Sequence, residues 1–261
     1  ILLAADPIVA VPPTGYGGIE RIVDALACEL HARGHTVALM AKAGSTCEVD
    51  ARFAWPGVSV NGRLDTLRNA LALHQAVRSF RPNVVHSFAR LAYLLPVLAS
   101  VTPKIMSYQR HTGARAIRPA LRLARRGTLR FTGCSEFICR QGRAAGGDWR
   151  PIFNFVDPRK FNFVAAVTVD APLVFLSRIE SIKGPDIAIA IARRTGRRLV
   201  LAGNRASEGS EARFFEEKIR PHLGSSNVEW IGEVDDPKKN RLLGQAAALL
   251  LPIRWQEPFG I

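Results

Sequence analysis

The sequence has no apolar run long enough to span a bilayer. Its longest apolar segments lie near Leu91–Val101 and Ala246–Ile253, well short of the roughly 20 residues that a transmembrane helix requires. Residues 1–5 follow neither an initiator Met nor a basic region, so they are interpreted as a first strand and not as a signal peptide. We therefore expect a globular protein of the cytoplasm.

Cysteine is scarce, and its spacing matches no metal or redox motif. There is no C-x-x-C pair, and one cysteine lies inside an amphipathic helical pattern. This favours reduced thiols over a disulfide framework or a zinc site, so no metal site is predicted. The four cysteines are Cys28, Cys47, Cys134 and Cys139.

Several catalytic motifs are also missing. The chain contains no Walker A glycine-lysine-serine/threonine run, no H-E-x-x-H and no G-x-S-x-G. These absences exclude P-loop kinases, zinc proteases of that motif and serine hydrolases with a nucleophile elbow.

Acidic residues are few beside basic ones, and the formal net charge is +14. A charge of this sign favours anionic partners such as phosphorylated ligands, nucleic acid or an anionic membrane surface. Hydrophobic residues make up 48% of the 261 residues, enough for one large core or two ordinary ones.

Strand and helix patterns alternate along the first half of the chain. A buried strand at Ile1–Ala5 leads through a Pro/Gly loop to a helix that ends at Gly34, and a strand follows at Val37–Ala41. This β-loop-α-β unit implies a parallel sheet. Further helices are expected at 64–80, 91–100 and 116–126, further strands at 84–87, 104–108 and 131–134, and Ser135 as an N-cap.

Periodicity fades from Gly142 to Asp170, as in a connection between domains. A second βαβ series follows, with strands expected at 173–177, 199–202, 228–231 and 248–252 and helices at 185–194, 211–220 and 237–245. We predict an α/β protein of two doubly wound domains, residues 1–165 and 166–261. The second is expected to be incomplete, because Ile261 falls where a loop should enter the next helix.

The strongest candidate site is the stretch from Leu173 to Gly184. A buried strand delivers Ser177 and Arg178, and Lys183 precedes the glycine that opens a helix. Cationic side chains at a helix N-terminus beyond a strand's carboxyl end favour an anion. Solvated surface cations are the structural alternative.

Two other loops contain candidate ligand-binding residues. Gly17 and Gly18 precede the first helix, where the backbone could approach a phosphate or sugar or merely turn. Glu257 follows the last strand, where a carboxylate could accept hydrogen bonds from sugar hydroxyls or stay an ordinary surface residue.

The segment 110–130 interleaves seven arginines with apolar residues. A basic amphipathic helix favours peripheral contact with a membrane surface, and a solvated face is the alternative. His86 and His111 follow strands of the first domain and are weaker candidates for a cleft between the domains.

Taken together, these motifs resemble family 4 glycosyltransferases, retaining enzymes of the GT-B fold. The similarity extends over nearly the whole chain, and its motifs are Gly17-Gly18-Ile19-Glu20-Arg21, Gly34-His35-Thr36-Val37, Val84-Val85-His86-Ser87, Gly133-Cys134-Ser135-Glu136, Asn154-Phe155-Val156-Asp157, Ser177-Arg178, Lys183-Gly184, Ala202-Gly203, Ile231-Gly232 and Glu257-Pro258-Phe259-Gly260. The resemblance implies two Rossmann-like domains facing a cleft.

The resemblance also implies site roles. Arg178 and Lys183 would hold the donor diphosphate, with Ser177 beside them and Gly17-Gly18 across the cleft. Glu257, with the backbone of Phe259-Gly260, would contact the transferred sugar and phosphate. A histidine by the donor sugar corresponds to His111 or, in another register, to Gln109. The family's second glutamate, which binds ribose, would lie beyond Ile261, and Phe155 replaces a usual glycine.

The expected function is transfer of a hexose-type sugar from a nucleotide-diphosphate donor to an unidentified acceptor hydroxyl, with retention. No cofactor or metal is expected, and no nucleic acid, because no aromatic-interleaved basic motif is present. Two alternatives remain. One is a non-catalytic α/β protein that binds a polyanion or anionic membrane, and the other is a sugar-nucleotide epimerase, which would need cleft acids that the sequence does not display.

Overall fold

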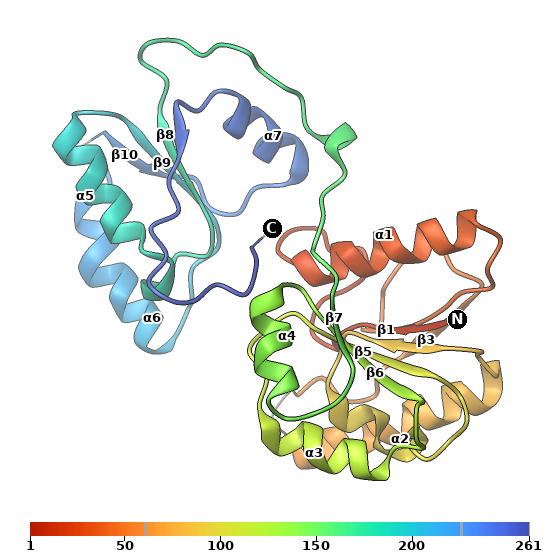
Figure 1. Ribbon diagram of the computed structural model, residues 1–261. Helices are drawn as coiled ribbons and strands as arrows, with labels where there is room; N and C mark the ends of the chain where they lie inside the picture. The colour runs from red at the N-terminus through yellow and green to blue at the C-terminus, as the bar shows by residue number, and fades with distance from the viewer. Residues whose placement is uncertain (60–61, 225–226, 261) are drawn as a thin grey trace. The chain divides into compact units, whose positions relative to one another are not determined.

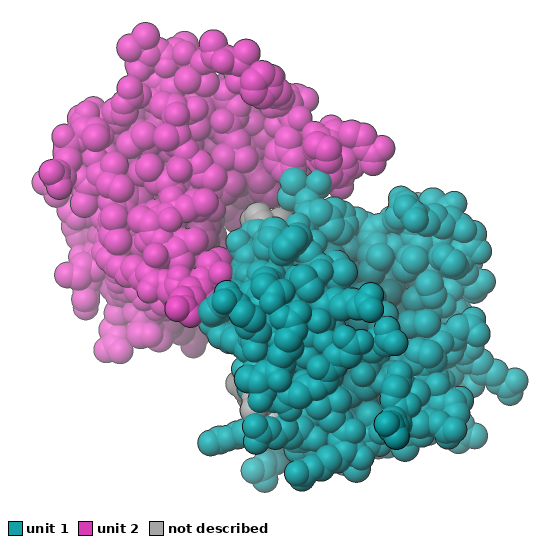
Figure 2. All heavy atoms as spheres, viewed as in Figure 1, with its two compact units in different colours: residues 1–156, 258–261 teal, residues 157–257 magenta. Residues whose placement is uncertain are grey.

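The computed structural model describes residues 1–59, 62–224 and 227–260. These residues form two compact units, Ile1–Val156 with Pro258–Ile261 and Asp157–Glu257 (Figure 2). The domain limits expected from the sequence, 1–165 and 166–261, stay a prediction. Among the described residues, no helix combines the length and the apolar character that crossing a membrane requires.

The first unit is built on a seven-stranded parallel sheet in the order β3-β2-β1-β4-β5-β6-β7. The chain starts in the middle of this sheet and extends it in both directions, as a doubly wound fold does. The strands are β1 (Leu2–Ala4), β2 (Ala38–Ala41), β3 (Ala51–Ala54), β4 (Val85–Ser87), β5 (Lys104–Tyr108), β6 (Leu129–Gly133) and β7 (Trp149–Pro151).

Helices cover both faces of this sheet (Figure 1). Successive residues of β1 point to opposite faces: Leu2 belongs to the core under α2 and α3, and Leu3 to the core under α1. The helices are α1 (Gly18–Ala32), α2 (Arg63–Phe80), the 3-10 helix η1 (Leu91–Val97), α3 (Ala114–Leu123) and α4 (Glu136–Arg143).

Two edge strands were missed by sequence analysis. β3 is half exposed with polar Arg52 in its middle, and β7 is three residues long and ends at Pro151. Both lie at the outer edges of the sheet, where short strands and proline are tolerated.

The helix expected over 91–100 was wrong in type and in its end. η1 is a 3-10 helix that stops at Val97 and contains Pro96, which lacks an N–H for an α-helical ladder. Ser135 does cap α4, since its Oγ accepts a hydrogen bond from the backbone N–H of Ile138 at 3.3 Å. That prediction is confirmed.

The second unit has a four-stranded parallel sheet in the order β10-β9-β8-β11. Its core forms between β8, β9 and β10 and the helices α5 and η4, with Phe175 and Phe215 fully buried. Its elements are η2 (Pro158–Lys160), β8 (Leu173–Leu176), η3 (Ser181–Lys183), α5 (Pro185–Thr195), β9 (Leu199–Ala202), α6 (Gly209–Phe214), the π-helix η4 (Phe215–Ile219), η5 (Arg220–His222), β10 (Val228–Trp230), α7 (Asp236–Gly244) and β11 (Ala248–Leu249).

Candidate functional site

The predicted anion site lies at the carboxyl edge of the second sheet. β8 ends at Leu176, and the backbone N–H of Ser177 continues the ladder by donating to Ala202 at 3.1 Å. Arg178 follows, and the short helix η3 carries Lys183 to the N-terminus of α5. The carboxyl edge of an open parallel sheet is where such folds bind ligands.

Lys183 and Glu257, which are 74 residues apart in the chain, form an ion pair at this edge. The Trp255 indole N–H also donates to Glu257 Oε2 at 2.9 Å, and Lys183 Nζ lies 5.6 Å from the centre of the Trp255 ring. The Lys183 side chain is only 13% exposed. The structure therefore brings two predicted site residues together and adds a tryptophan that sequence reasoning missed, although it stands two residues from Glu257.

Arg178 is held in a similar way. Its guanidinium pairs with Glu180, whose side chain is 18% exposed. The two candidate cations of this loop are thus each matched with a carboxylate within the same unit. A phosphate ligand would have to share or replace these carboxylates, because it would compete for the same N–H donors.

Two further contacts anchor the loop that carries Lys183. Glu211 accepts from both the backbone N–H and the hydroxyl of Ser181, each at 2.7 Å. Arg254 donates to Asp186 at 2.9 and 2.6 Å and to the Ser181 carbonyl at 2.9 Å. Glu211 thus joins α6 to the loop after β8, and Arg254 joins the segment after β11 to it, which holds Lys183 and Glu257 in register.

Two glycines permit this close packing. Gly184 has φ +74°, and a Cβ there would lie 2.2 Å from the Pro252 carbonyl oxygen. Gly203 has φ +147°, and a Cβ there would lie 1.8 Å from the Ser177 carbonyl oxygen. No side chain fits at either position, so the backbone itself forms the wall of the site.

The glycine turn of the first unit precedes α1. Gly17 has φ +150° and is the N-cap, with its carbonyl accepting from Arg21 N–H at 3.1 Å. Arg21 donates from its guanidinium to the Gly15 carbonyl at 2.9 Å, which closes the turn on itself. Gly18 begins α1. That Gly17 and Gly18 face the second unit stays a prediction.

Two buried carboxylates accompany this turn. Asp6 follows β1 and is 8% exposed, and Glu20 in the first turn of α1 is 6% exposed. Burial raises the pKa of both groups, although Arg110 opposes the shift. Carboxyl groups with raised pKa values suit proton transfer. Sequence reasoning did not single them out, and the signal for Asp6 was its place directly after a strand.

His111, the candidate histidine, is exposed, unlike these two carboxylates. His111 Nδ1 lies 3.1 Å from Gln141 Nε2, and its ring meets Phe137 edge-on at 5.5 Å. Gln109, the other register, has a buried side-chain oxygen without a hydrogen-bond partner among the described residues. His86 is half-buried and bonds Ser107 Oγ at 2.7 Å, which is a structural role.

Phe259 and Gly260 group with the first unit. The Phe259 ring stacks on Phe153 at 6.0 Å, and Gly260 has φ +89°. The structure therefore gathers Ser177, Arg178, Lys183 and Glu257 at one sheet edge of the second unit. It places Gly17, Gly18, His111, Phe259 and Gly260 in the first.

Comparison with known proteins agrees with this architecture. A glycogen synthase from Mycobacterium tuberculosis (strain CDC 1551 / Oshkosh) is 25% identical, covering 96% of this chain and 72% of that relative. AviGT4, a glycosyltransferase involved in avilamycin A biosynthesis, is 29% identical, with a TM-score of 0.66 over 99% of this chain and 74% of that one.

A glycosyltransferase from Rickettsia africae ESF-5 shares the fold, with a TM-score of 0.73 and 17% identity over 99% of this chain and 74% of that one. The GT-B fold class expected from the sequence is confirmed. Residues 159–261 match the family model for Glycosyl transferases group 1, and residues 16–160 match that for Glycosyltransferase Family 4. The chain belongs to Glycosyltransferase Family 4.

Proposed function

We propose that the protein transfers a hexose-type sugar, with retention, from a nucleotide-diphosphate donor to an acceptor hydroxyl. The observation that carries this proposal is the cluster of Arg178, Lys183 and Glu257 at the carboxyl edge of the second sheet. Membership of a glycosyltransferase family supports the reaction class, and the similarity to a glycogen synthase supports a hexose.

In the proposed reaction, the donor diphosphate takes the place of carboxylate oxygens around Arg178 and Lys183. Fixed positive charge at the N-terminus of α5 then stabilises the leaving diphosphate as the glycosidic bond breaks. Glu257, released from Lys183, accepts hydrogen bonds from the sugar. The two cations supply the charge that a divalent metal would otherwise provide, so no metal is needed for transfer.

Retention requires either a carboxylate nucleophile or attack from the face that the leaving group departs. Each acid beside these cations is already engaged, Glu257 by Lys183 and Trp255 and Glu180 by Arg178. We therefore favour same-face attack, with the leaving phosphate taking the acceptor proton.

Replacing each cation tests the proposal. R178A and K183A should each lower sugar transfer by about 10²–10³-fold, because each removes a charge that acts on the leaving group. Transfer and hydrolysis would be measured with a panel of UDP-, ADP- and GDP-linked hexoses, and nucleoside diphosphate binding by thermal shift.

The matched control is R194A, an exposed arginine at the C-terminal end of α5. It removes the same charge from the same unit and should leave transfer unchanged. Undiminished transfer in both R178A and K183A would rule out the diphosphate role.

We also propose that this cytoplasmic enzyme touches an anionic membrane through residues 110–130. All seven arginines of the segment are exposed, whereas Ile117 and Ala120 of α3 are buried in the core of the first unit. The apolar face of α3 is therefore packed against the core and is not available for insertion into a bilayer. The contact with the membrane would be electrostatic. The arginines are Arg110, Arg115, Arg118, Arg122, Arg125, Arg126 and Arg130.

A further inference from the structure

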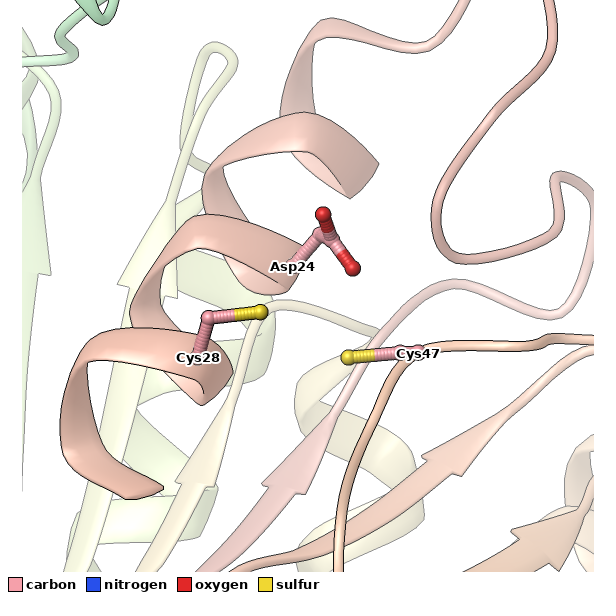
Figure 3. A group of neighbouring side chains, drawn as sticks. All are labelled: Asp24, Cys28 and Cys47. Atoms are coloured by element: carbon pink, nitrogen blue, oxygen red, sulfur yellow. The ribbon is translucent and has the colours of Figure 1, made fainter. Parts of the chain in front are cut away.

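Three potential metal ligands meet beside α1, in a region that the proposed transfer reaction does not use. Asp24 and Cys28 lie one turn apart on the helix, and Cys47 comes from the loop after β2. Figure 3 shows the Cys28 and Cys47 sulfur atoms directed toward each other, with the Asp24 carboxylate beside them. One oxygen and the two sulfurs all lie within 4.8 Å of one another.

This spacing suits a small tetrahedral cation. Zinc–sulfur bonds of about 2.3 Å and zinc–oxygen bonds of about 2.0 Å put tetrahedral ligand atoms roughly 3.5–3.8 Å apart. The three atoms, which lie within 4.8 Å of one another, would therefore move closer by about 1.3 Å at most to reach these separations. Because Asp24 and Cys28 are four residues apart on a helix, their side chains share one face.

The elements that carry the ligands are already held in place. Cys47 is 2% exposed and belongs to the same core cluster as Val23 and Ala27 of α1. Its backbone N–H donates to the Val11 carbonyl at 3.0 Å. Cys28 is exposed, which leaves a path for an ion to enter. A site held by such packing loses little entropy on binding.

Negative charge lies beside the two thiols. Burial raises the pKa of both Cys28 and Cys47, and the negative charge of Asp24 raises them further. Glu48 acts in the same direction on Cys28. The guanidinium of Arg52 also lies nearby, but it donates to the Cys47 backbone carbonyl, at 3.4 Å, and the carboxylates still raise the pKa of the thiols. A divalent cation reverses the balance, because it neutralises the carboxylate and the thiolates together.

We infer that Asp24, Cys28 and Cys47 form a binding site for one thiophilic divalent cation of the Zn²⁺ type. Water fills the fourth position, and the two thiol protons go to solvent on binding. The ion would pin α1 to the loop after β2. It lies in the first unit and takes no part in the transfer chemistry proposed for Arg178 and Lys183.

Cobalt titration of the reduced, chelator-treated protein tests this inference. Co²⁺ should bind at one equivalent per chain with the sulfur-to-metal charge-transfer absorption of thiolate ligation, and Zn²⁺ should displace it. C28S and D24N should each weaken Co²⁺ binding, C28S by more than about 100-fold, since even outer-sphere changes cost about 10–100-fold. Zn²⁺ should raise the Tm of the unmodified protein and not that of C28S.

E29Q is the matched control, because Glu29 lies on the same helix but pairs with Arg33. It changes the charge as D24N does and should leave Co²⁺ affinity unchanged. Binding that survives C28S would overturn the inference and point to other thiols such as Cys134 and Cys139. Absence of charge-transfer absorption, or a Cys28–Cys47 disulfide in a protein that binds no Co²⁺ when reduced, would also overturn it.

Discussion

The negative charge of Glu257 has two opposing effects on Lys183. Glu257 accepts from Trp255 and pairs with Lys183, so its charge fixes the position of the lysine while reducing the positive field there. A buried or half-buried ion pair of this kind orients side chains more than it stabilises the fold. A substitution that removes the charge of Glu257 but keeps the shape of its side chain separates these two effects.

We predict that E257Q binds free nucleoside diphosphate more tightly and transfers sugar more slowly. Loss of one negative charge beside Lys183 should improve diphosphate affinity about fivefold, or about 1 kcal/mol at high effective dielectric. Transfer should fall by about 10²-fold or more, because a sugar contact is weakened in the transition state. Calorimetric titration and initial rates measure the two quantities.

E216Q provides the comparison for this prediction. Glu216 is paired with Arg220 and Arg205 on the surface of the same unit and makes no ion pair with Lys183 or Arg178. Its replacement should change neither quantity. An E257Q variant with weaker diphosphate binding would contradict the idea that Glu257 competes with phosphate.

Three neighbouring strands of the first sheet are joined by a chain of polar side chains, of which Ser107 is buried and His86 and Thr132 are half-buried. His86 of β4 bonds Ser107 of β5 at 2.7 Å, and Ser107 bonds Thr132 of β6 at 2.6 Å. Burial lowers the pKa of His86 to about 4. The imidazole is therefore neutral in the folded protein at pH 7, where the chain of hydrogen bonds is complete.

This shift predicts a loss of stability in acid. Below an unfolded-state pKa of about 6.5, the unfolded chain binds a proton that the folded protein does not accept until pH falls to about 4. The stabilising effect is thus fully present above pH 6.5 and is lost as pH falls toward 4. It amounts to about 3 kcal/mol.

Urea unfolding at pH 7 and pH 4.5 measures the effect. H86Q keeps a hydrogen-bonding side chain but cannot titrate, so its stability should fall less between these pH values than that of the unmodified protein. H35Q, at an exposed histidine after α1, should behave as the unmodified protein does. An equal decline in H86Q would show that the acid sensitivity lies in other groups.

Across the whole molecule, the net charge of +14 predicts association with anionic surfaces, and the arginines of residues 110–130 concentrate part of it. R118A/R122A should weaken binding to vesicles that contain phosphatidylglycerol by about 30-fold at low salt, at about 1 kcal/mol per arginine. Sedimentation with these vesicles and with phosphatidylcholine alone measures it.

R193A/R194A removes the same charge from an exposed position on α5 and is the control. It should retain binding if the contact is local to residues 110–130. Equal loss in the two double variants would indicate a general effect of net charge, and tight binding to phosphatidylcholine alone would contradict an electrostatic contact.

Sequence pattern was sufficient for the alternation of strands and helices and for the parallel sheets. Alternating apolar runs and amphipathic segments are local properties, and a βαβ order leaves few topologies open. The same reasoning located Arg178 and Lys183, since a cation just after a buried strand must lie at the sheet's carboxyl edge. It failed for β3 and β7, because edge strands carry little apolar signal.

Contacts between segments that are distant in the sequence could not be predicted from it and are seen only in the folded structure. Lys183 and Glu257 are 74 positions apart and Cys28 and Cys47 are 19 positions apart, and no pattern in the sequence predicts that either pair meets. Lys104 is another case: it is 1% exposed and donates to three carbonyls at the end of η1. Local sequence constrains backbone geometry and exposure, whereas side-chain meetings depend on how whole elements pack. The family resemblance and the parallel α/β architecture could therefore be recognised from the sequence, and the paired carboxylates and the thiol cluster could not.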